Sequence, residues 1–415
     1  MSGVEWRAMR LAGRLLGLLV AALASFAALA AELGDRVIAS SLISAVPTNL
    51  SSNTETMVSY RHQERMWQGA DGSLHLVVNR GTLQPNPGIV LTSSYDGGIT
   101  WTVKQVFGNT DKDSTADSLM NGSMLWLAYG DANGALIVAQ LTYDSVAQSW
   151  TLLRSEIAFA STQFEGINPT LGIDDSGVVW CSFAAMDRNT ADINLRMVYR
   201  QSDSAPWADT GLVFGPTDNL SKERSARPVR LPNGMGLLYR VRQSMYWATR
   251  ANGAPFGSPW PSVKISEGAL QRPISDPYAS HFSVIGEGDA HLHLAIADDG
   301  DVQYLRYTTA DDSWTAARKI NGRKKVSYLQ IGLFNGQIAL ALSATRGDGG
   351  VLVSSDHGAS FSTQVDLALP PAADGVNYKT GRVEMAAVSV GGLTVLQQYE
   401  ERRQQRLMVF KIPAN

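Results

Sequence analysis

The chain has little cysteine and little net charge, and beyond residue 30 it has no long hydrophobic run. Its 415 residues include one cysteine, Cys181, so no internal disulfide can form and packing alone must hold the fold. The formal net charge of −3 gives no reason to expect nucleic acid or an anionic membrane surface as a partner. Without a later apolar segment, no transmembrane span is expected once the first residues are removed.

The first thirty residues differ in kind from the rest. Arg7, Arg10 and Arg14 precede an apolar run over residues 15–30 that ends in the small-residue pattern Ala28-Leu29-Ala30. This order is typical of a secretory signal peptide. We therefore predict a signal peptide over residues 1–30, one domain over residues 31–415, and a secreted or periplasmic protein. The alternative is an uncleaved anchor, for which the run is short.

Tight turns and aromatic residues are plentiful, and they recur. The chain has 38 glycines, 10 tryptophans and 13 tyrosines, a composition that favours strands joined by turns. A polar turn followed by an alternating apolar run appears seven times at a period of about 50 residues. These runs begin at Ala70, Asn121, Asp175, Pro232, Glu287, Asn335 and Gly391. A second series, in step with the first, consists of Trp101, Trp150, Trp207, Trp260, Trp314 and Phe361.

Each repeat is predicted to form four short strands. The aromatic residue stands at the start of the fourth. Such a unit cannot bury both faces alone, whereas radial stacking buries them and protects the edges, so the repeats predict an all-β, seven-bladed β-propeller. The seventh unit ends at residues 406–412 without a fourth strand, and residues 35–44 form a strand-like segment outside any unit. We expect this N-terminal strand to complete the last blade. A six-bladed ring is the alternative.

Two turns share the sequence motif Ser-x-Asp-x-Gly-x-Ser/Thr-aromatic, at residues 94–101 and 354–361. In an antiparallel blade the turn between strands three and four lies at the end opposite to the loops that enter the first strands. Asp96 and Asp356 should cap these turns through backbone amides, with glycine at positive φ and the aromatic residue packed between blades. The motif is therefore interpreted as a structural feature of the turns.

This motif resembles the Asp-box, or BNR, repeat of sialidases and sialidase-like propellers. The resemblance in blade architecture covers nearly the whole mature chain. Blade topology places the site at the loops that enter the lead strands, which should cluster around the channel mouth. Arg65 stands where the arginine of the sialidase Arg-Ile-Pro motif is expected, and Arg240 fits the family's second arginine. Tyr328 resembles the nucleophilic tyrosine.

The chain also departs from the sialidase pattern. The loop over residues 80–88, where the family carries an aspartic general acid, contains no aspartate. Arg227-Pro228 replaces the expected glutamate-proline pair. The third arginine has three candidates, namely Arg272, Arg346 and Arg382.

The loops that enter the lead strands therefore define a rim rich in arginine, tyrosine and histidine, which suits a carboxylated sugar. Arg227 is expected on this rim as the strong cation. The predicted catalytic residues are Tyr328, Arg65, Arg227, Arg240 and His281, and the predicted substrate-binding residues are His62, Glu165, Asn168, Arg224, Tyr278 and Arg382. The expected partner is an acidic polysaccharide or glycoconjugate, bound by a monomer without a cofactor.

Three functions fit this rim. The first is a sialidase-like glycoside hydrolase; the second is a polysaccharide lyase in which Arg227 neutralises a uronate and Tyr328, His62 or His281 moves protons. The third is a propeller that binds a glycan or a protein without catalysis. No metal site is predicted, because His291 and His293 read as a solvent-facing pair on one strand.

Overall fold

The computed structural model describes most of the chain beyond residue 44. The described residues are 45–58, 62–108, 110, 114–218, 225–242, 244–268, 281–298, 300–320, 326–344, 348–368 and 379–413. Strands make up most of them, with a 3-10 turn η2 (Thr309–Asp311). No helix within these ranges has the length and apolar character needed to span a membrane. The predicted signal peptide and the strand-like residues 35–44 lie outside the described residues.

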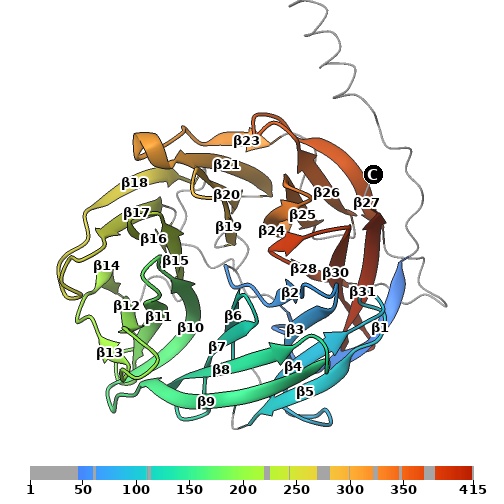
Figure 1. Cartoon of the computed structure of the whole chain (residues 1–415), viewed down its shortest axis with the longest axis horizontal. Coiled ribbons are helices and arrows are strands. Elements are labelled where there is room, and N and C mark those ends of the chain that lie inside the picture. The colour runs from blue at the N-terminus through green and yellow to red at the C-terminus, as the bar shows by residue number, and fades with distance from the viewer. Residues whose placement is uncertain are drawn as a thin grey trace, which may run out of the picture. The chain divides into compact units, whose positions relative to one another are not determined.

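The strands form seven sheets, each antiparallel in its main strands, arranged as blades around a central axis (Figure 1). Blade 1 contains β2 (Met66–Gln68), β3 (Leu74–Asn79), β4 (Ile89–Ser94) and β5 (Thr102–Phe107); blade 2 contains β6 (Ala116–Asn121), β7 (Met124–Gly130), β8 (Leu136–Asp144) and β9 (Ser149–Phe159). Blade 3 contains β10 (Phe164–Ile173), β11 (Val179–Asp187), β12 (Ile193–Arg200), β13 (Ala208–Asp209) and β14 (Phe214–Asp218); blade 4 contains β15 (Ser225–Leu231), β16 (Gly234–Val241), β17 (Ser244–Ala251) and β18 (Ser262–Glu267).

The remaining three blades follow the same order. Blade 5 contains β19 (Phe282–Glu287), β20 (His291–Asp298), β21 (Asp301–Thr308), β22 (Ser313–Trp314) and β23 (Arg318–Ile320). Blade 6 contains β24 (Val326–Phe334), β25 (Gln337–Ala344), β26 (Asp348–Ser354) and β27 (Ser362–Ala368), with β29 (Val388–Ser389) parallel to β24. Blade 7 contains β28 (Lys379–Met385), β30 (Gly392–Glu401), β31 (Gln404–Pro413) and β1 (Val46–Ser52).

The hydrophobic core is divided among the junctions between blades. At one junction, Leu76 and Trp101 of blade 1 pack with Leu396 and Val409 of blade 7. A single blade cannot cover these side chains, so the alternating apolar runs require a neighbour on each side. The seven sheets confirm the predicted seven-bladed propeller, and the six-bladed alternative is wrong.

The ring closes through a strand from the N-terminal side, as predicted, but with different residues. The closing strand is β1, which pairs antiparallel with β31, Val46 opposite Val409 and Ser52 opposite Gln405. Periodicity misses β1 because Pro47 and several small polar residues dilute its apolar pattern. Proline is tolerated there because β1 is an outer edge strand, which needs fewer backbone donors.

The two Asp-containing turns have the hydrogen bonds expected of caps. Asp96 accepts hydrogen bonds from the backbone N–H of Ile99 at 3.0 Å and of Thr100 at 2.9 Å. Gly98 has a φ of 94°, and its carbonyl accepts the indole N–H of Trp101 at 2.8 Å. In the second turn Asp356 accepts from the N–H of Ser360 at 2.8 Å. Both carboxylates therefore stabilise the turns in which they lie.

A pair of truncations tests the closure. A chain that begins at Asn53 lacks β1, so it loses the burial of Leu50 and exposes the edge of β31. We expect its unfolding free energy to fall by about 3 kcal/mol or more. A chain that begins at Ala45 keeps β1 and should melt close to the full-length protein in thermal denaturation. Equal melting of the two truncated chains would contradict this assignment.

Candidate functional site

The first strands of the seven blades surround the axis (Figure 1). Because each blade repeats the same order of antiparallel strands, they begin at the same end of the axis. These lead strands are β2, β6, β10, β15, β19, β24 and β28. We call the end where they begin the loop face, and the opposite end, which carries the turns that follow them and the two Asp-containing turns, the turn face. Residues at equivalent places in different lead strands consequently lie near one another at the axis.

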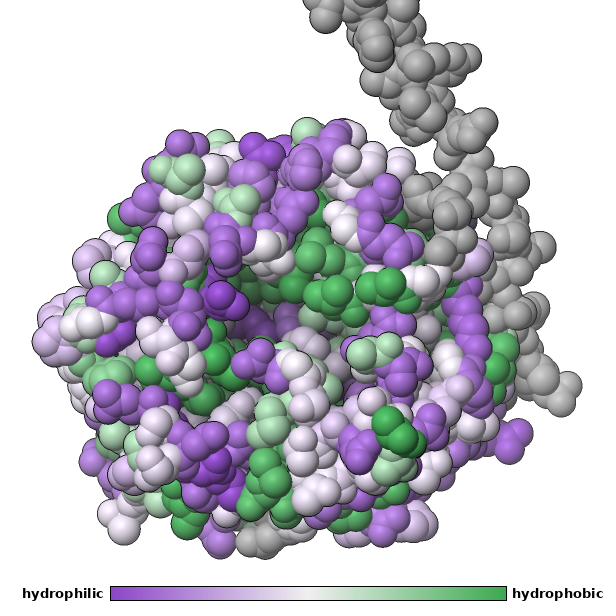
Figure 2. Space-filling model, in the orientation of Figure 1, coloured by the Kyte–Doolittle hydropathy of each residue, from purple (hydrophilic) through white to green (hydrophobic). Residues whose placement is uncertain are grey.

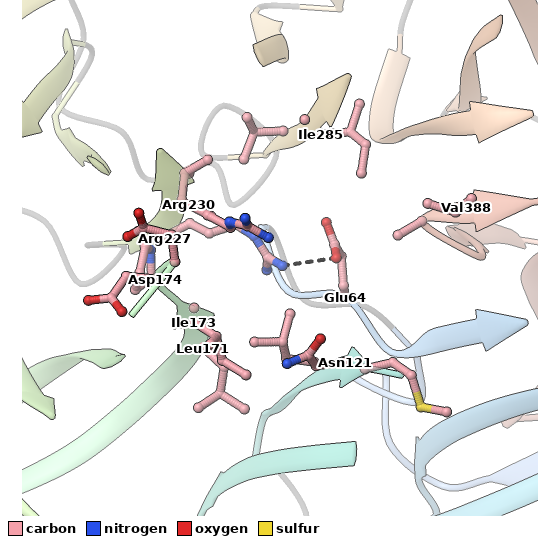
Figure 3. A pocket seen from close by; sticks show the side chains of 18 of the residues that line it. Glu64, Asn121, Leu171, Ile173, Asp174, Arg227, Arg230, Ile285 and Val388 are labelled. Atoms are coloured by element: carbon pink, nitrogen blue, oxygen red, sulfur yellow. Dashed lines mark ion pairs between the residues drawn. The ribbon is translucent and has the colours of Figure 1, made fainter. Parts of the chain in front are cut away.

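An arginine bound by two carboxylates lies at the axis. The guanidinium of Arg227 on β15 donates to Glu64 Oε2 at 2.9 Å, to Asp117 Oδ1 at 3.2 Å and to the carbonyl of His62 at 2.9 Å (Figure 3 marks the pair with Glu64). Asp117 also accepts the backbone N–H groups of Glu64 at 2.6 Å and Leu171 at 2.8 Å. Blades 1 to 4 are therefore joined by one network of charge-assisted hydrogen bonds.

A second arginine extends this network to blades 6 and 7. The side chain of Arg65 donates to the carbonyls of Ala116 at 2.8 Å, Thr56 at 3.0 Å and Met57 at 3.3 Å, and to Gln63 Oε1 at 3.1 Å. Its backbone N–H donates to Glu384 Oε1 at 3.0 Å, which also accepts from Gln330 Nε2 at 3.0 Å. We call Glu64, Arg65, Asp117, Arg227 and Glu384 the axial cluster. No member is more than 5% exposed.

Burial sets the protonation of the axial cluster. Desolvation raises the pKa of Glu64 to about 7; Arg227 opposes this rise, whereas Asp117 and Glu384 add to it. Desolvation lowers the pKa of Arg65 to about 10. It acts in the same direction on Arg227, but Glu64 and Asp117 outweigh it and raise the pKa of Arg227. Both arginines therefore stay charged at neutral pH. The guanidinium of Arg382 adds to the lowering of the pKa of Arg65, and Glu64 retains a proton up to near neutrality.

An aromatic and cationic group lies at the loop face, and three predicted site residues form it. The ring of His281 meets the ring of Tyr328 edge-on, with 4.7 Å between centroids. The guanidinium carbon of Arg382 lies 5.1 Å from the centre of the Tyr328 ring, while its Nε donates to the carbonyl of Glu55 at 3.0 Å. Tyr328 follows a register irregularity in β24, a feature that re-aims a side chain. We call Tyr328, His281 and Arg382 the loop-face triad.

The other predicted site residues are dispersed. His62 stacks on Phe282 with 5.1 Å between centroids. Arg240 is buried on β16 and donates to the carbonyl of Arg242 at 3.2 Å. Asn168, at a φ of 51°, accepts from Thr115 Oγ1 at 3.2 Å. Glu165 is half-buried near the start of β10. Arg224 and Tyr278 lie outside the described residues.

Arg227 is not the rim cation that the sequence suggested. It is the third residue of β15, and its guanidinium is buried in the axial cluster, where carboxylates from two other blades neutralise it. Sequence reasoning assigned no role to Glu64, Asp117 or Glu384. The signal that could have found them is a charged residue within several of the lead strands, such as Asp117, Arg227 and Glu384.

The prediction of a solvent-facing pair at His291 and His293 is wrong for His293. This residue is fully buried and bonds Glu287 Oε2 at 3.0 Å and the hydroxyl of Tyr304 at 2.6 Å. Burial lowers the pKa of His293 to about 4 despite the nearby carboxylate. Within the part of the chain that the structure describes, no group of three or more His, Cys, Asp or Glu side chains is arranged to hold a metal ion.

A cavity of about 410 Å³ lies along the axis on the turn-face side of the axial cluster. Glu64 and Arg227 line it at the axis, and the later residues of the lead strands form its wall (Figure 3). In the view of Figure 2 the centre of the ring is hollowed, with hydrophobic residues gathered along part of the hollow. The cavity therefore combines an apolar wall with a charged inner end.

No family model matches the sequence, and no curated protein matches it. Similar solved structures include the NanB sialidase from Streptococcus pneumoniae, at 12% identity, with 89% of this chain and 71% of that chain covered and a TM-score of 0.46. The Trypanosoma rangeli sialidase is 10% identical, with 88% and 59% covered and a TM-score of 0.46. The polysaccharide lyase Uly1 is 11% identical, with 84% and 90% covered and a TM-score of 0.47. At these values the likeness carries no argument about chemistry.

The axial cluster predicts an unusual dependence of stability on pH. Because the pKa of Glu64 is raised from 4.5 to about 7, its contribution to stability is fully present below pH 4.5 and is lost as the pH rises through 7. Glu64→Gln removes this loss and leaves Arg227 paired with Asp117. The unfolding free energy of the variant relative to the parent should rise by about 3 kcal/mol between about pH 4 and about pH 8.

Denaturant melts across this pH range measure the effect. The same change at the exposed Glu267 serves as a control for loss of a surface charge. Arg227→Met should instead destabilise the protein at neutral pH by roughly 3–5 kcal/mol, because it leaves buried carboxylates without their cation. A pH-independent difference between Glu64→Gln and the parent would show that Glu64 does not hold the proton.

Proposed function

We propose that the protein cleaves an acidic polysaccharide at the loop face by β-elimination next to a uronate. The observation that carries the proposal is the loop-face triad, in which a phenol, an imidazole and a guanidinium lie in contact. A guanidinium can neutralise a uronate carboxylate, which makes the adjacent carbon-bound proton more acidic. A phenol and an imidazole are the two groups able to take up and return protons.

The reaction needs only these groups. Arg382 would bind the carboxylate of the uronate, and one member of the Tyr328–His281 pair would remove the proton from C5. The electron pair left behind forms the C4–C5 double bond as the bond from C4 to the leaving oxygen breaks. The other member of the pair would protonate that oxygen, so the products are an unsaturated uronate and a new free end.

Sialidase-like hydrolysis is the second candidate, and the likeness of Tyr328 to the family's nucleophile favours it. That route also needs a carboxylic acid to protonate the leaving group. Glu64, with its raised pKa, is a described carboxyl that would hold a proton near neutral pH. It is bonded to Arg227, however, and lines the cavity toward the turn face. The available chemistry at the loop face therefore favours elimination.

Product analysis with a matched pair of tyrosine variants tests the proposal. The purified protein is incubated with uronate polymers and with sialosides, and the products are followed by near-ultraviolet absorbance and mass spectrometry. Tyr328→Phe should lower turnover at least about 100-fold, since it removes a proton-transfer group. Tyr95→Phe makes the same change on the turn face, where the hydroxyl donates to the carbonyl of Gln148, and should leave turnover unchanged.

The products distinguish the candidates. An unsaturated uronate supports elimination, whereas free sialic acid contradicts it and favours hydrolysis. Binding of a polymer without any product would contradict catalysis and leave a binding propeller.

We also propose that residues 1–30 direct export, as their arginines and apolar run suggest. N-terminal sequencing of the exported protein should find a chain that begins near Ala31. An intact Met1 on the exported protein would count against cleavage.

A further inference from the structure

The loop over residues 80–88 joins β3 to β4 at the loop face, because β3 runs away from the turn face, and it begins with an arginine. The Nε atom of Arg80 is buried but has no hydrogen-bond partner among the residues that the structure describes. Desolvation lowers the pKa of Arg80, and no described carboxylate is close enough to raise it. The chain therefore holds a half-buried cation at the loop face without supplying an anion for it.

Hydrogen bonds hold this loop in place. The backbone N–H of Arg80 donates to the carbonyl of Gly88 at 2.9 Å, and that of Gly88 donates to the carbonyl of Gly81 at 2.7 Å. Farther along the loop, the N–H of Leu83 donates to Asn53 Oδ1 at 3.2 Å. The base of the loop is closed and its tip is tied to the segment that follows β1, so the backbone from which the Arg80 side chain projects is fixed.

The same segment after β1 also holds Arg382 of the loop-face triad. Arg382 Nε donates to the carbonyl of Glu55 at 3.0 Å. Two residues later, the carbonyl of Met57 accepts the backbone N–H of Asn79 at 2.9 Å. Two residues span at most about 7 Å. Arg382 and Arg80, the residue after Asn79, are therefore attached to neighbouring points of one segment.

The carboxylates of this region do not neutralise Arg80. Glu401, at the end of β30, pairs with Arg406 at 2.9 Å. Glu55 is exposed, and neither of the two glutamates raises the pKa of Arg80. A second anionic group on a substrate bound at Arg382 would therefore find at Arg80 a cation that no described side chain of the protein occupies.

We propose that Arg80 binds a second carboxylate of the polysaccharide whose reacting uronate lies at Arg382, so that the loop face selects polymers with closely spaced uronates. A guanidinium can bind a carboxylate through two parallel N–H donors. The contact is remote from the bond that breaks, so it should strengthen binding of the substrate and of the transition state alike. This inference rests on the function proposed above for the loop face.

Binding without cleavage tests the contact. Tyr328→Phe, which is expected to be inactive, is titrated by calorimetry with galacturonate hexamers and with the same hexamers as methyl esters. The free-acid hexamer should bind at least about tenfold more tightly than its ester, because the ester cannot form charge-assisted bonds to arginine. Adding Arg80→Gln should weaken binding of the free-acid hexamer at least about tenfold and leave the affinity for the ester unchanged.

A matched variant controls for the loss of one positive charge. Arg188 is an exposed arginine at the loop face of blade 3, where it donates to the carbonyl of Asn133. Arg188→Gln should change the affinity for the free-acid hexamer less than about twofold, because solvent and salt screen a distant charge. Arg80→Gln should melt like the parent, since the described residues offer the Arg80 side chain no hydrogen bond to lose.

Kinetics give a second readout in the protein with Tyr328 intact. Because the contact is made equally in the substrate complex and the transition state, Arg80→Gln should raise KM for a uronate polymer about tenfold at nearly constant kcat. A fall in kcat at constant KM would instead mean that Arg80 acts in the chemical step, and it would overturn the assignment as a binding residue.

The outcomes separate this inference from the proposed function. Equal weakening by Arg80→Gln and Arg188→Gln would overturn the inference, and so would failure of the free-acid hexamer to bind. Formation of an unsaturated uronate with the same KM in Arg80→Gln as in the parent would overturn it while supporting elimination. Binding that depends on Arg80 but never leads to cleavage would support the contact and contradict the lyase.

Discussion

The guanidinium of Arg227, buried at the axis between Glu64 and Asp117, is the interaction on which the centre of this molecule depends. A charge in that position is tolerable only when its partners are in place, and those partners belong to two other blades. Asp117 in turn accepts a backbone donor of blade 3, at Leu171. Apolar packing between blades allows some sliding, whereas these short polar contacts do not. The axial cluster thus determines how the lead strands stand relative to one another.

The same cluster divides the axis into two chemically different ends. Toward the loop face the neighbouring groups are an imidazole, a phenol and a guanidinium, whereas toward the turn face they are aliphatic. Glu64 and Arg227 are part of the buried network and also line the cavity. The ion pair of Glu64 and Arg227 is therefore common to the buried network and to the cavity.

Sequence reasoning predicted the architecture because the repeat is long and regular, and because turns with characteristic residues separate its strands. The period of about 50 residues corresponds to four strands and their turns, and the hydrogen bonds of Asp96 agree with its interpretation as a cap. It missed the position of Arg227, since a polar residue after a loop looks the same in sequence whether it faces solvent or the axis. It also missed β1, where Pro47 and serines obscure a strand that pairing with β31 stabilises.

The pairing of β1 with β31 also bears on how the protein reaches its native state. Residue 46 lies opposite residue 409, so this sheet joins strands that are widely separated in the sequence. During synthesis β1 has no partner until β31 has been made, so the junction between the first and the seventh blade closes late. Contacts of such large sequence separation slow folding and prolong the exposure of unpaired strand edges. A late-closing chain of this kind therefore stays exposed to aggregation until β1 and β31 pair.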